Sequence, residues 1–356
     1  MSRTGRMSWV GCVFVGAAVQ GCGVGLDEVD AVAAALNDVP AWQKKVAAPS
    51  PGTRYGHALV YDAARRETVL FSGDGKSGRN NETWTWNGTA WRKKSPSKKP
   101  AARCNASAAF DSARNVVVLF GGDTCAVTEP EFAPVDQKTF EWNGANWAQK
   151  SSTGPAKRTG AGMAYDVARG KTVLFGGSGA RVGGRGTFLN DTWEWNGSTW
   201  TRVATPAAPS ARTGVGMVYD SARAKIVLFG GMEFRPGGNG HLADTWEYDG
   251  ATWTKIETPI LPQPLAEHGL RLHGMTFDSC RGKTVVFGGE QTWGYGSPDL
   301  FMYDGAAWTQ VTGLPADLWA RRSSPLAFDK DRCRGVLHGG WVRATGTKLG
   351  DTWETY

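Results

Sequence analysis

A pattern of apolar and polar positions recurs six times along the chain of 356 residues. Its clearest copy, residues 171–200, has an apolar run that ends in Gly-Gly, a loop rich in Gly and Arg, a second run with Trp193 and Trp195, an Asn-Gly pair and Trp200. Copies with the same order begin near Val69, Val118, Val227, Val285 and Val336, at a spacing of roughly fifty residues. The chain is therefore expected to use its length in one repetitive domain.

Each copy predicts four strands. In the third copy, residues 158–165 alternate small and apolar side chains and predict strand a, and residues 172–175 form the mostly apolar run that is typical of a strand b buried on both faces. Residues 192–195 predict strand c. The Asn196-Gly197 pair predicts a two-residue turn with both residues at positive φ, after which Trp200 begins strand d. Each copy is expected to be a four-stranded antiparallel meander.

The two ends of the chain complement one another. The sixth copy stops at Tyr356, before an Asn-Gly pair and a fourth strand. Trp42 lies twelve residues before Arg54, which is also the interval between Trp91 and Arg103. Residues 41–46 are therefore expected to supply the fourth strand of the last copy and to close a ring of six sheets packed face to face.

The Gly-Gly, the aromatic residue on strand c and the Trp five residues later resemble the kelch repeat over about residues 41–356. Two positions depart from the pattern, because Ser72 replaces the first Gly in one copy and His338 replaces Phe in another. The resemblance implies an all-β, six-bladed β-propeller of four-stranded antiparallel blades, the last blade closed by the N-terminal strand.

The first 40 residues differ from the repeats. Arg3 and Arg6 make a basic start, and residues 9–19 form an apolar stretch too short to span a bilayer as a stable anchor. The following Val-Gln-Gly-Cys resembles a bacterial lipobox, which implies lipidation of Cys22; the alternative is ordinary cleavage nearby and a freely secreted protein. We expect a signal segment (residues 1–22), a tether (residues 23–40) and an exported protein, either a membrane-anchored lipoprotein or a periplasmic or extracellular one.

Four further cysteines predict two disulfides. Cys104 opens strand a of the second copy and Cys125 follows the Gly-Gly of strand b, and Cys280 and Cys333 lie in the a–b turns of the neighbouring fifth and sixth copies. The second bond is expected to hold the closing copy to its neighbour. Because the chain has no Cys-x-x-Cys and no His at ligand spacing beside any Cys, we expect no metal and no cofactor.

Composition changes this account little. The chain has 48 Gly and 17 Trp, and glycine punctuation with aromatic residues at fixed offsets is typical of repeated all-β folds. The formal net charge is +7, a mild basic bias. The densest basic run, residues 92–99, contains no aromatic side chain, so we interpret it as a solvated loop and expect no nucleic-acid partner.

The connections predict which end of the sheets binds a ligand. The a–b turns and c–d turns are short and nearly uniform, whereas the b–c loops, such as residues 123–138 and 178–190, are diverse, and the d–a stretches vary in length. Successive connections of a meander alternate between its two ends, so the b–c and d–a loops share one face. We expect this diverse face to be the binding face.

A repeated arginine begins strand a and is expected at the channel mouth on that face. The arginines are Arg54, Arg103, Arg158, Arg212 and Arg322, with Arg271 the nearest match in the fifth copy. An anion-attracting mouth is one interpretation; the other is structural, because Asp191, Asp244, Asp299 and Asp351 precede strand c at the same end and could pair with the arginines. Lys138 replaces the acidic residue in the second copy, which makes Arg103 a candidate ligand contact.

Other candidate contacts lie outside the repeat pattern. Polar candidates in the loops are Arg181, Arg185, Arg235 and His241. Aromatic candidates, which could instead cover the ends of the core, are Trp293, Tyr295, Trp319 and Trp341. No residue set indicates catalysis. The sequence thus favours an exported cell-envelope module that binds a protein or glycan through the b–c and d–a face; the alternatives are an envelope enzyme acting on a carbohydrate or anionic small molecule at the channel mouth, and a purely structural envelope protein.

Overall fold

The computed structural model describes residues 40–125, 136–180, 187–235, 238–258, 261–294 and 296–356. Residues 40–356 form one compact unit. The predicted signal segment, the lipobox Cys22 and nearly all of the predicted tether lie outside the described residues, as do Arg181, Arg185 and Tyr295. None of the helices in the described part of the chain is both long and apolar enough to cross a membrane.

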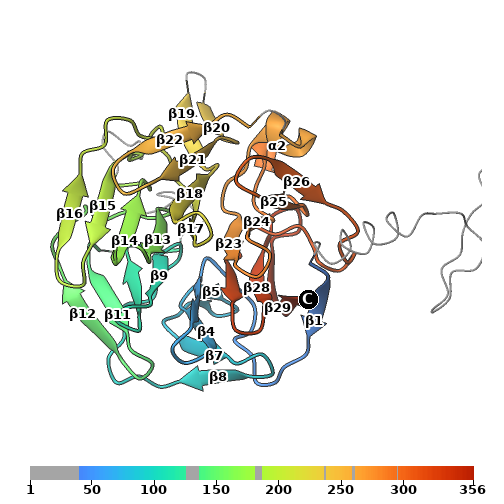
Figure 1. The fold of residues 1–356 in the computed structure, drawn as a ribbon. Helices are drawn as coiled ribbons and strands as arrows, with labels where there is room; N and C mark the ends of the chain where they lie inside the picture. Colours follow the sequence, from blue (N-terminus) through green and yellow to red (C-terminus); the bar gives the residue numbers. More distant parts are fainter. Residues whose placement is uncertain (1–39, 126–135, 181–186, 236–237, 259–260, 295) are drawn as a thin grey trace, which may run out of the picture. The chain divides into compact units, whose positions relative to one another are not determined.

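The described chain contains six four-stranded antiparallel sheets (Figure 1). The first holds β3 (Ala58–Asp62), β4 (Glu67–Phe71), β7 (Thr83–Trp86) and β8 (Trp91–Lys94). The second holds β9 (Ser107–Asp111), β10 (Val116–Phe120), β11 (Thr139–Trp142) and β12 (Trp147–Ser151). The third holds β13 (Gly162–Asp166), β14 (Lys171–Phe175), β15 (Thr192–Trp195) and β16 (Trp200–Val203).

The remaining sheets follow the same order. The fourth holds β17 (Gly216–Asp220), β18 (Lys225–Phe229), β21 (Thr245–Tyr248) and β22 (Trp253–Ile256). The fifth holds β23 (Gly274–Asp278), β24 (Lys283–Phe287), β25 (Leu300–Tyr303) and β26 (Trp308–Val311). The sixth holds β27 (Leu326–Asp329), β28 (Arg334–Val342), β29 (Thr347–Thr355) and β1 (Trp42–Lys45). The all-β architecture is consistent with a β-propeller.

Short elements lie in the loops. They are β2 (Arg54–Tyr55), β5 (Asp74–Gly75), β6 (Gly78–Arg79), β19 (Met232–Arg235), β20 (Gly238–His241), helix α2 (Gln263–His268) and the 3-10 turn η1 (Thr292–Gly294). The first three make a small sheet in the order β2-β5-β6, and β19 pairs with β20. All of them lie in b–c or d–a connections, which confirms that structural variation is concentrated at that end of the sheets.

The N-terminal strand completes the sixth sheet, as the spacing of Trp42 and Arg54 predicts. Strand β1 pairs with β29 in antiparallel register, with Trp42 opposite Thr355 and Lys45 opposite Thr352. Ala41 and Tyr356 exchange two backbone hydrogen bonds of 3.3 and 2.7 Å just beyond the strands. The last sheet is therefore assembled from both ends of the described chain.

A closed circuit of backbone hydrogen bonds links all six sheets. The N–H of Gly56 donates to the carbonyl of Ser323, and each later member of the circuit donates to the one before it until Ser323 donates to Leu272. The members are Gly56, Asn105, Gly160, Gly214, Leu272 and Ser323, with bonds of 2.7–3.1 Å and φ values of 51–66°. We call this circuit the amide ring. It lies where the chain enters each first strand, and a cavity of about 140 Å³ adjoins it.

The first strand of each sheet contacts the first strand of the next, and β27 contacts β3. These strands line a second cavity of about 490 Å³, to which all six sheets contribute, for example through Tyr61, Phe110 and Tyr165. We call the space along these strands and the amide ring the channel. Other buried apolar side chains pack between neighbouring sheets, as Val69 and Phe71 do against Val117 and Phe140.

Tryptophans join neighbouring sheets through a repeated contact. The indole of the Trp that begins the fourth strand donates to a Thr of the third strand of the preceding sheet, over 2.7–3.0 Å. The pairs are Trp91–Thr352, Trp147–Thr83, Trp200–Thr139, Trp253–Thr192 and Trp308–Thr245. The Trp91–Thr352 pair spans the first and sixth sheets, so the same contact operates between the two ends of the chain.

The boundary between the fifth and sixth sheets lacks this contact. Leu300 stands where the other sheets have Thr, and the buried Nε1 of Trp42 has no hydrogen-bond partner among the described residues. The predicted Cys280–Cys333 disulfide joins the a–b turns of these two sheets. A covalent bond therefore lies at the boundary where the repeated hydrogen bond is missing.

The predicted geometry of the c–d turn is wrong. Trp195 pairs with Trp200, so the turn has four residues, and only Gly197 has a positive φ, of 98°. The side chain of Asn196 accepts hydrogen bonds from the backbone N–H groups of Ser198 and Thr199, at 2.9 and 2.8 Å. An Asn that caps the turn with its own side chain needs no left-handed backbone.

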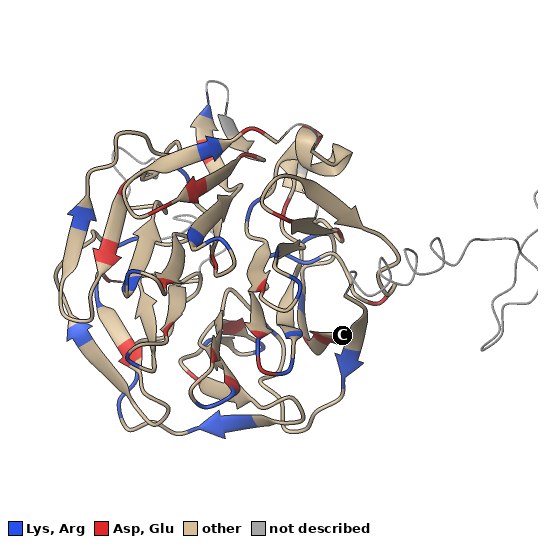
Figure 2. Ribbon diagram, in the orientation of Figure 1, with Lys and Arg blue, Asp and Glu red and all other residues tan. Residues whose placement is uncertain are grey.

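Basic residues are prominent on the outer strands, as Figure 2 shows for β1, β8, β12, β16 and β22. The predicted basic run at residues 92–99 begins on β8, where Lys94 pairs with Glu67 at 3.2 Å. On β12, Lys150 lies 3.8 Å from Glu141. These charges lie on the outer edges of the sheets, away from the channel.

Candidate functional site

The residues that follow the repeated arginine bring the b–c loops to the channel. Each makes an antiparallel bridge with a residue just after strand b of its own sheet. The pairs are Tyr55–Asp74, Cys104–Asp123, Thr159–Ser178, Thr213–Met232, Arg271–Glu290 and Arg322–Trp341. We call this set of twelve residues the channel mouth. Its six pairs differ in chemistry, unlike the repeated residues around them.

The repeated arginines are buried and paired, which confirms the structural interpretation of these residues. Arg158 donates to Asp191 at 2.6 and 2.9 Å and to the carbonyl of Gly176 at 2.9 Å. The other pairs are Arg54–Glu82, Arg103–Asp136, Arg212–Asp244 and Arg321–Asp351. Each arginine is 1–2% exposed, so none of the five is open to a ligand.

Three predictions about these arginines need correction. Arg103 is not left without an acid, because Asp136, two residues before Lys138, takes the acidic position. The sixth arginine of the pattern is Arg321 and not Arg322. In the fifth sheet Leu270 occupies the arginine position, and Asp299 instead accepts hydrogen bonds from Ser297 and Gln310.

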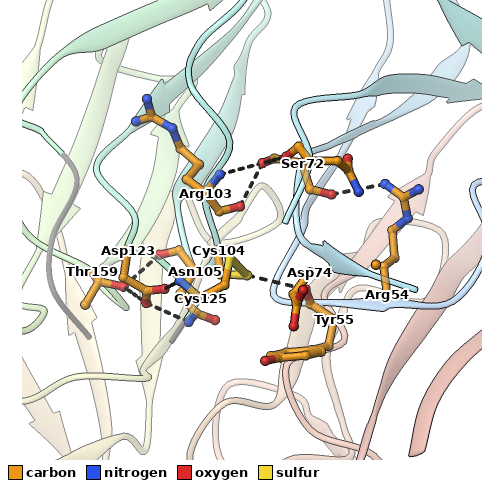
Figure 3. The surroundings of a disulfide bond; sticks show 12 residues. Arg54, Tyr55, Ser72, Asp74, Arg103, Cys104, Asn105, Asp123, Cys125 and Thr159 are labelled. Atoms are coloured by element: carbon orange, nitrogen blue, oxygen red, sulfur yellow. Dashed lines mark hydrogen bonds between the residues drawn. A yellow bond between two sulfur atoms is a disulfide. The ribbon is translucent and has the colours of Figure 1, made fainter. Parts of the chain in front are cut away.

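The Cys104–Cys125 disulfide confirms the predicted pairing and lies at the channel mouth (Figure 3). Asp123, between the two cysteines in sequence, is 1% exposed. Its carboxylate accepts hydrogen bonds from Asn105 at 2.8 Å and from Thr159 at 2.6 Å. Burial raises the pKa of Asp123, and these hydrogen bonds only partly oppose the shift. The cysteines are committed to the disulfide, so their sulfurs are not free thiolate ligands.

Ser72 explains one departure from the Gly-Gly pattern. Its hydroxyl accepts from the N–H of Arg103 at 2.8 Å and donates to the carbonyl of Arg103 at 2.7 Å (Figure 3). At the matching Gly121, an added Cβ would lie 2.3 Å from the carbonyl oxygen of Arg158. Glycine therefore allows close approach of neighbouring sheets, and in the first sheet a hydroxyl bonds across the same gap.

A second group of charges occupies the mouth between the fifth and sixth sheets. Glu290 is 1% exposed, and its carboxylate pairs with Arg271 at 3.2 Å and also with Arg322 and Arg343. We call Arg271, Arg322, Arg343 and Glu290 the arginine cluster. Burial raises the pKa of Glu290, but Arg271, Arg322 and Arg343 outweigh that effect and lower it overall.

Of the polar candidates, His241 lies near this cluster and Arg235 pairs elsewhere. His241 ends β20 and is half-buried; burial and the nearby Arg271 lower its pKa to about 4, so it is neutral at pH 7. Arg235, on β19, is exposed and pairs with Glu233 at 2.8 Å. The structure thus brings His241 to the arginine cluster, whereas Arg235 pairs within its own hairpin.

Two side chains of the mouth pack on Trp341. The ring of Tyr55 stacks on it with centroids 5.6 Å apart, and the guanidinium carbon of Arg322 lies 4.2 Å from its centroid. Lys348 in turn lies over Tyr55 and pairs with Asp74 at 2.8 Å. Trp341 therefore makes structural contacts with other residues of the mouth.

Other aromatic side chains are exposed on the loop face. Trp319 is 50% exposed and lines a groove with Pro298, Leu314 and Pro315. Phe234 is 51% exposed and stacks on Phe188 with centroids 4.0 Å apart. The side chain of Trp293 lies outside the described residues.

Comparison of the chain with models of protein families finds no match. A search of curated proteins also finds no match.

The sequence interpretation missed the arginine cluster as a unit. The sequence did contain signals of this cluster. Arg271 and Arg322 each stand one position after the position of the repeated arginine, which Leu270 and Arg321 occupy. Glu290 directly follows a Gly-Gly. Arg343 lies in the b–c loop of the sixth sheet, where no repeat position predicts its direction. These residues share no motif because they belong to two different sheets.

Proposed function

We propose that the protein is an exported, six-bladed, kelch-like β-propeller that binds a partner at the cell envelope through its b–c and d–a loops. Six four-stranded sheets and the closed amide ring support the blade number. Two disulfides fit an extracellular or periplasmic location. Lipidation at Cys22 would hold the protein at a membrane surface.

The difference between the two ends of the channel carries the proposal. At the turn end, each sheet repeats an Arg–Asp pair in its a–b turn, such as Arg169 with Asp166. At the loop end, the bridged pairs of the mouth are all different, and Trp319 and Phe234 are exposed. Repetition of this kind preserves a scaffold, whereas diverse side chains on a rigid support are typical of recognition.

We favour binding over catalysis. The five repeated arginines are neutralised by their acids and are buried, so they do not converge as unpaired groups at the mouth. The carboxyl of Asp123 is enclosed by Asn105, Thr159 and the Cys125 amide. An envelope protein or glycan is the proposed partner.

A screen of glycans and peptidoglycan fragments against the full chain tests the proposal, followed by capture of protein partners from the envelope. The matched variants are Trp319→Ala with Phe234→Ala on the loop face, and Val167→Ala, a 55% exposed apolar residue in an a–b turn. We expect the loop-face changes to weaken binding and Val167→Ala to leave it intact. Equal loss in both, or binding unaffected by the loop changes, would count against this face.

A further inference from the structure

The arginine cluster has more positive than negative charge. Three guanidinium groups, those of Arg271, Arg322 and Arg343, share the single carboxylate of Glu290. The side chains of Arg271 and Arg322 are each 14% exposed and that of Arg343 is 49% exposed, so solvent reaches all three. Arginine keeps its charge at any physiological pH, which leaves an excess of two positive charges at this side of the mouth.

The arginines of the a–b turns are neutralised more fully. Arg114 pairs with two carboxylates, those of Asp111 and Glu141, and although its burial acts in the other direction, they raise its pKa. The pKa of Arg322 is instead lowered, first by burial and then by its like-charged neighbours Arg271 and Arg343, against the opposing effect of Glu290. Glu141 also lies 3.8 Å from Lys150, so the charges around Arg114 balance, whereas those of the cluster do not.

The cluster also has unused hydrogen-bond donors. A guanidinium has five N–H donors, whereas a carboxylate accepts at about four positions. Within the described chain, the buried Nε atoms of Arg271 and Arg322 have no hydrogen-bond partner, and neither has the Nδ1 atom of His241. Arg271 donates its other N–H groups to Glu290 and to the thioether of Met232, which is a weak acceptor.

Space for a small group adjoins Arg271. A cavity of about 30 Å³ lies beside it and is lined by the hydroxyl residues Thr159, Ser178 and Thr213. Its wall is completed by apolar side chains, including Phe188 and Met232. A carboxylate or phosphate oxygen directed into this space would meet the Arg271 guanidinium and the Ser178 hydroxyl, because the hydroxyls of Thr159 and Thr213 already donate to Asp123 and to the Thr159 carbonyl.

We propose that the arginine cluster binds an oxyanion, namely a carboxylate or phosphate group of the ligand held at the channel mouth. This inference rests on the proposed function, because it names the chemical group of the ligand that the same loop face binds. Arg271 and Arg322 would hold the oxyanion from the channel side, and the more exposed Arg343 would close over it. Glu290 keeps the three arginines together and at the same time competes with the ligand for them.

Calorimetric titration of the full chain with small probes tests this assignment. The probes are D-glucuronate and inorganic phosphate, at one fixed low salt concentration, with D-glucose as the uncharged counterpart of glucuronate. Binding of glucuronate identifies a carboxylate site, and binding of phosphate alone identifies a phosphate site. Glucose should not bind through this cluster. If the wild-type chain binds neither anion, the proposal is wrong.

Two substitutions with opposite predicted signs sharpen the test. Arg343→Gln removes a charged donor whose side chain is half exposed, and should weaken anion binding roughly tenfold. Glu290→Gln removes the competing carboxylate and should strengthen it. Arg66→Gln, at an 80% exposed arginine in an a–b turn, is the matched control and should change nothing. Equal weakening by Arg343→Gln and Arg66→Gln would show general charge attraction and overturn the proposal.

The thermal unfolding midpoint of each variant separates binding from folding. If Glu290→Gln does not fold, Arg343→Gln and its control still decide the question, because neither side chain is buried. If neither small anion binds, the proposed function is not contradicted by that result. A chain that binds an envelope partner through its loop face but ignores both anions would keep the proposed function and lose this inference.

Discussion

The indole Nε1 of Trp91 donates a 2.9 Å hydrogen bond to the hydroxyl of Thr352, which joins the first sheet to the last strand of the chain. His338 Nδ1 lies 2.9 Å from the same hydroxyl, and both neighbours are buried. One side chain thus satisfies two buried polar groups where the ends of the chain meet.

Replacing the Thr352 hydroxyl should weaken the contact between the first and sixth sheets. Thr352→Val keeps the shape but leaves the Trp91 indole unpaired, and should lower the free energy of unfolding by about 1–3 kcal/mol. Urea denaturation measures the change. Thr352→Ser retains the hydroxyl and should recover most of the loss; if the two variants are equally destabilised, the hydrogen bond is not the cause.

The N-terminal strand should be needed for stability. Trp42 is 8% exposed and packs with Phe287 and Trp353 in the core of the fifth and sixth sheets. Trp42→Ala should therefore cost about 3–5 kcal/mol in urea denaturation. Val46→Ala, 97% exposed in the same segment, is the control and should cost almost nothing. A small effect of Trp42→Ala would show that β1 is not an integral part of the last sheet.

The two disulfides should contribute unequally. Cys280–Cys333 closes a sequence separation of 53 residues and Cys104–Cys125 one of 21. From loop-closure entropy, Cys280–Cys333 should add about 4 kcal/mol to the free energy of unfolding and Cys104–Cys125 about 3 kcal/mol. Only Cys280–Cys333 lies at the boundary that lacks the Trp–Thr contact. Serine pairs at each position, compared by thermal unfolding, should rank in that order. The reverse order would show that the boundary between the fifth and sixth sheets is held by other contacts.

Buried histidines should make the protein sensitive to acid. His338 is fully buried, and burial lowers its pKa to about 3, against 6.5 in the unfolded chain. Between these values the unfolded state binds one more proton, so stability falls as pH drops, by about 1.4 kcal/mol per pH unit. His273, with a pKa lowered to about 3 by burial, adds to the same trend.

Replacing His338 with Phe, the residue that the repeat has at this position, should remove the contribution of His338 to the acid sensitivity. The slope of unfolding free energy between pH 6 and pH 4.5 should decrease by about 1.4 kcal/mol per pH unit in His338→Phe. His268→Gln, a more exposed histidine of α2, controls for the loss of a histidine elsewhere. An unchanged slope in His338→Phe would mean that other groups set the acid sensitivity.

Strands and disulfides could be predicted from the sequence because both follow local rules. Strand b, predicted as residues 172–175, is observed as Lys171–Phe175, since an apolar run between a turn and Gly-Gly has few other conformations. Cys104 and Cys125 could be paired because an a–b hairpin fixes which residues are opposite. The fourth strand of the last sheet followed from one repeated interval, that between Trp42 and Arg54.

The channel mouth could not be predicted in the same way. Asp136 replaces Lys138 as the partner of Arg103 because a loop of different length shifts the acidic residue along the chain. Glu290 and Arg343 meet across two sheets, and their approach depends on loop paths that no repeat position fixes. The turn at Asn196 was predicted wrongly because the Asn-Gly pair permits more than one turn length. Repetition thus predicts the scaffold, and its interruptions contain the candidate site.

The most direct test of the proposed binding face blocks one face at a time. Phe234→Cys on the loop face and Val167→Cys in an a–b turn each add one exposed thiol to a chosen face, because the four cysteines in the described part of the chain are in disulfides. Each variant is coupled to a polyethylene-glycol maleimide, and its binding to the envelope fraction of the source organism is measured. We predict that the modified Phe234→Cys chain loses binding and that the modified Val167→Cys chain keeps it. The reverse pattern would place recognition on the uniform turns and contradict the account.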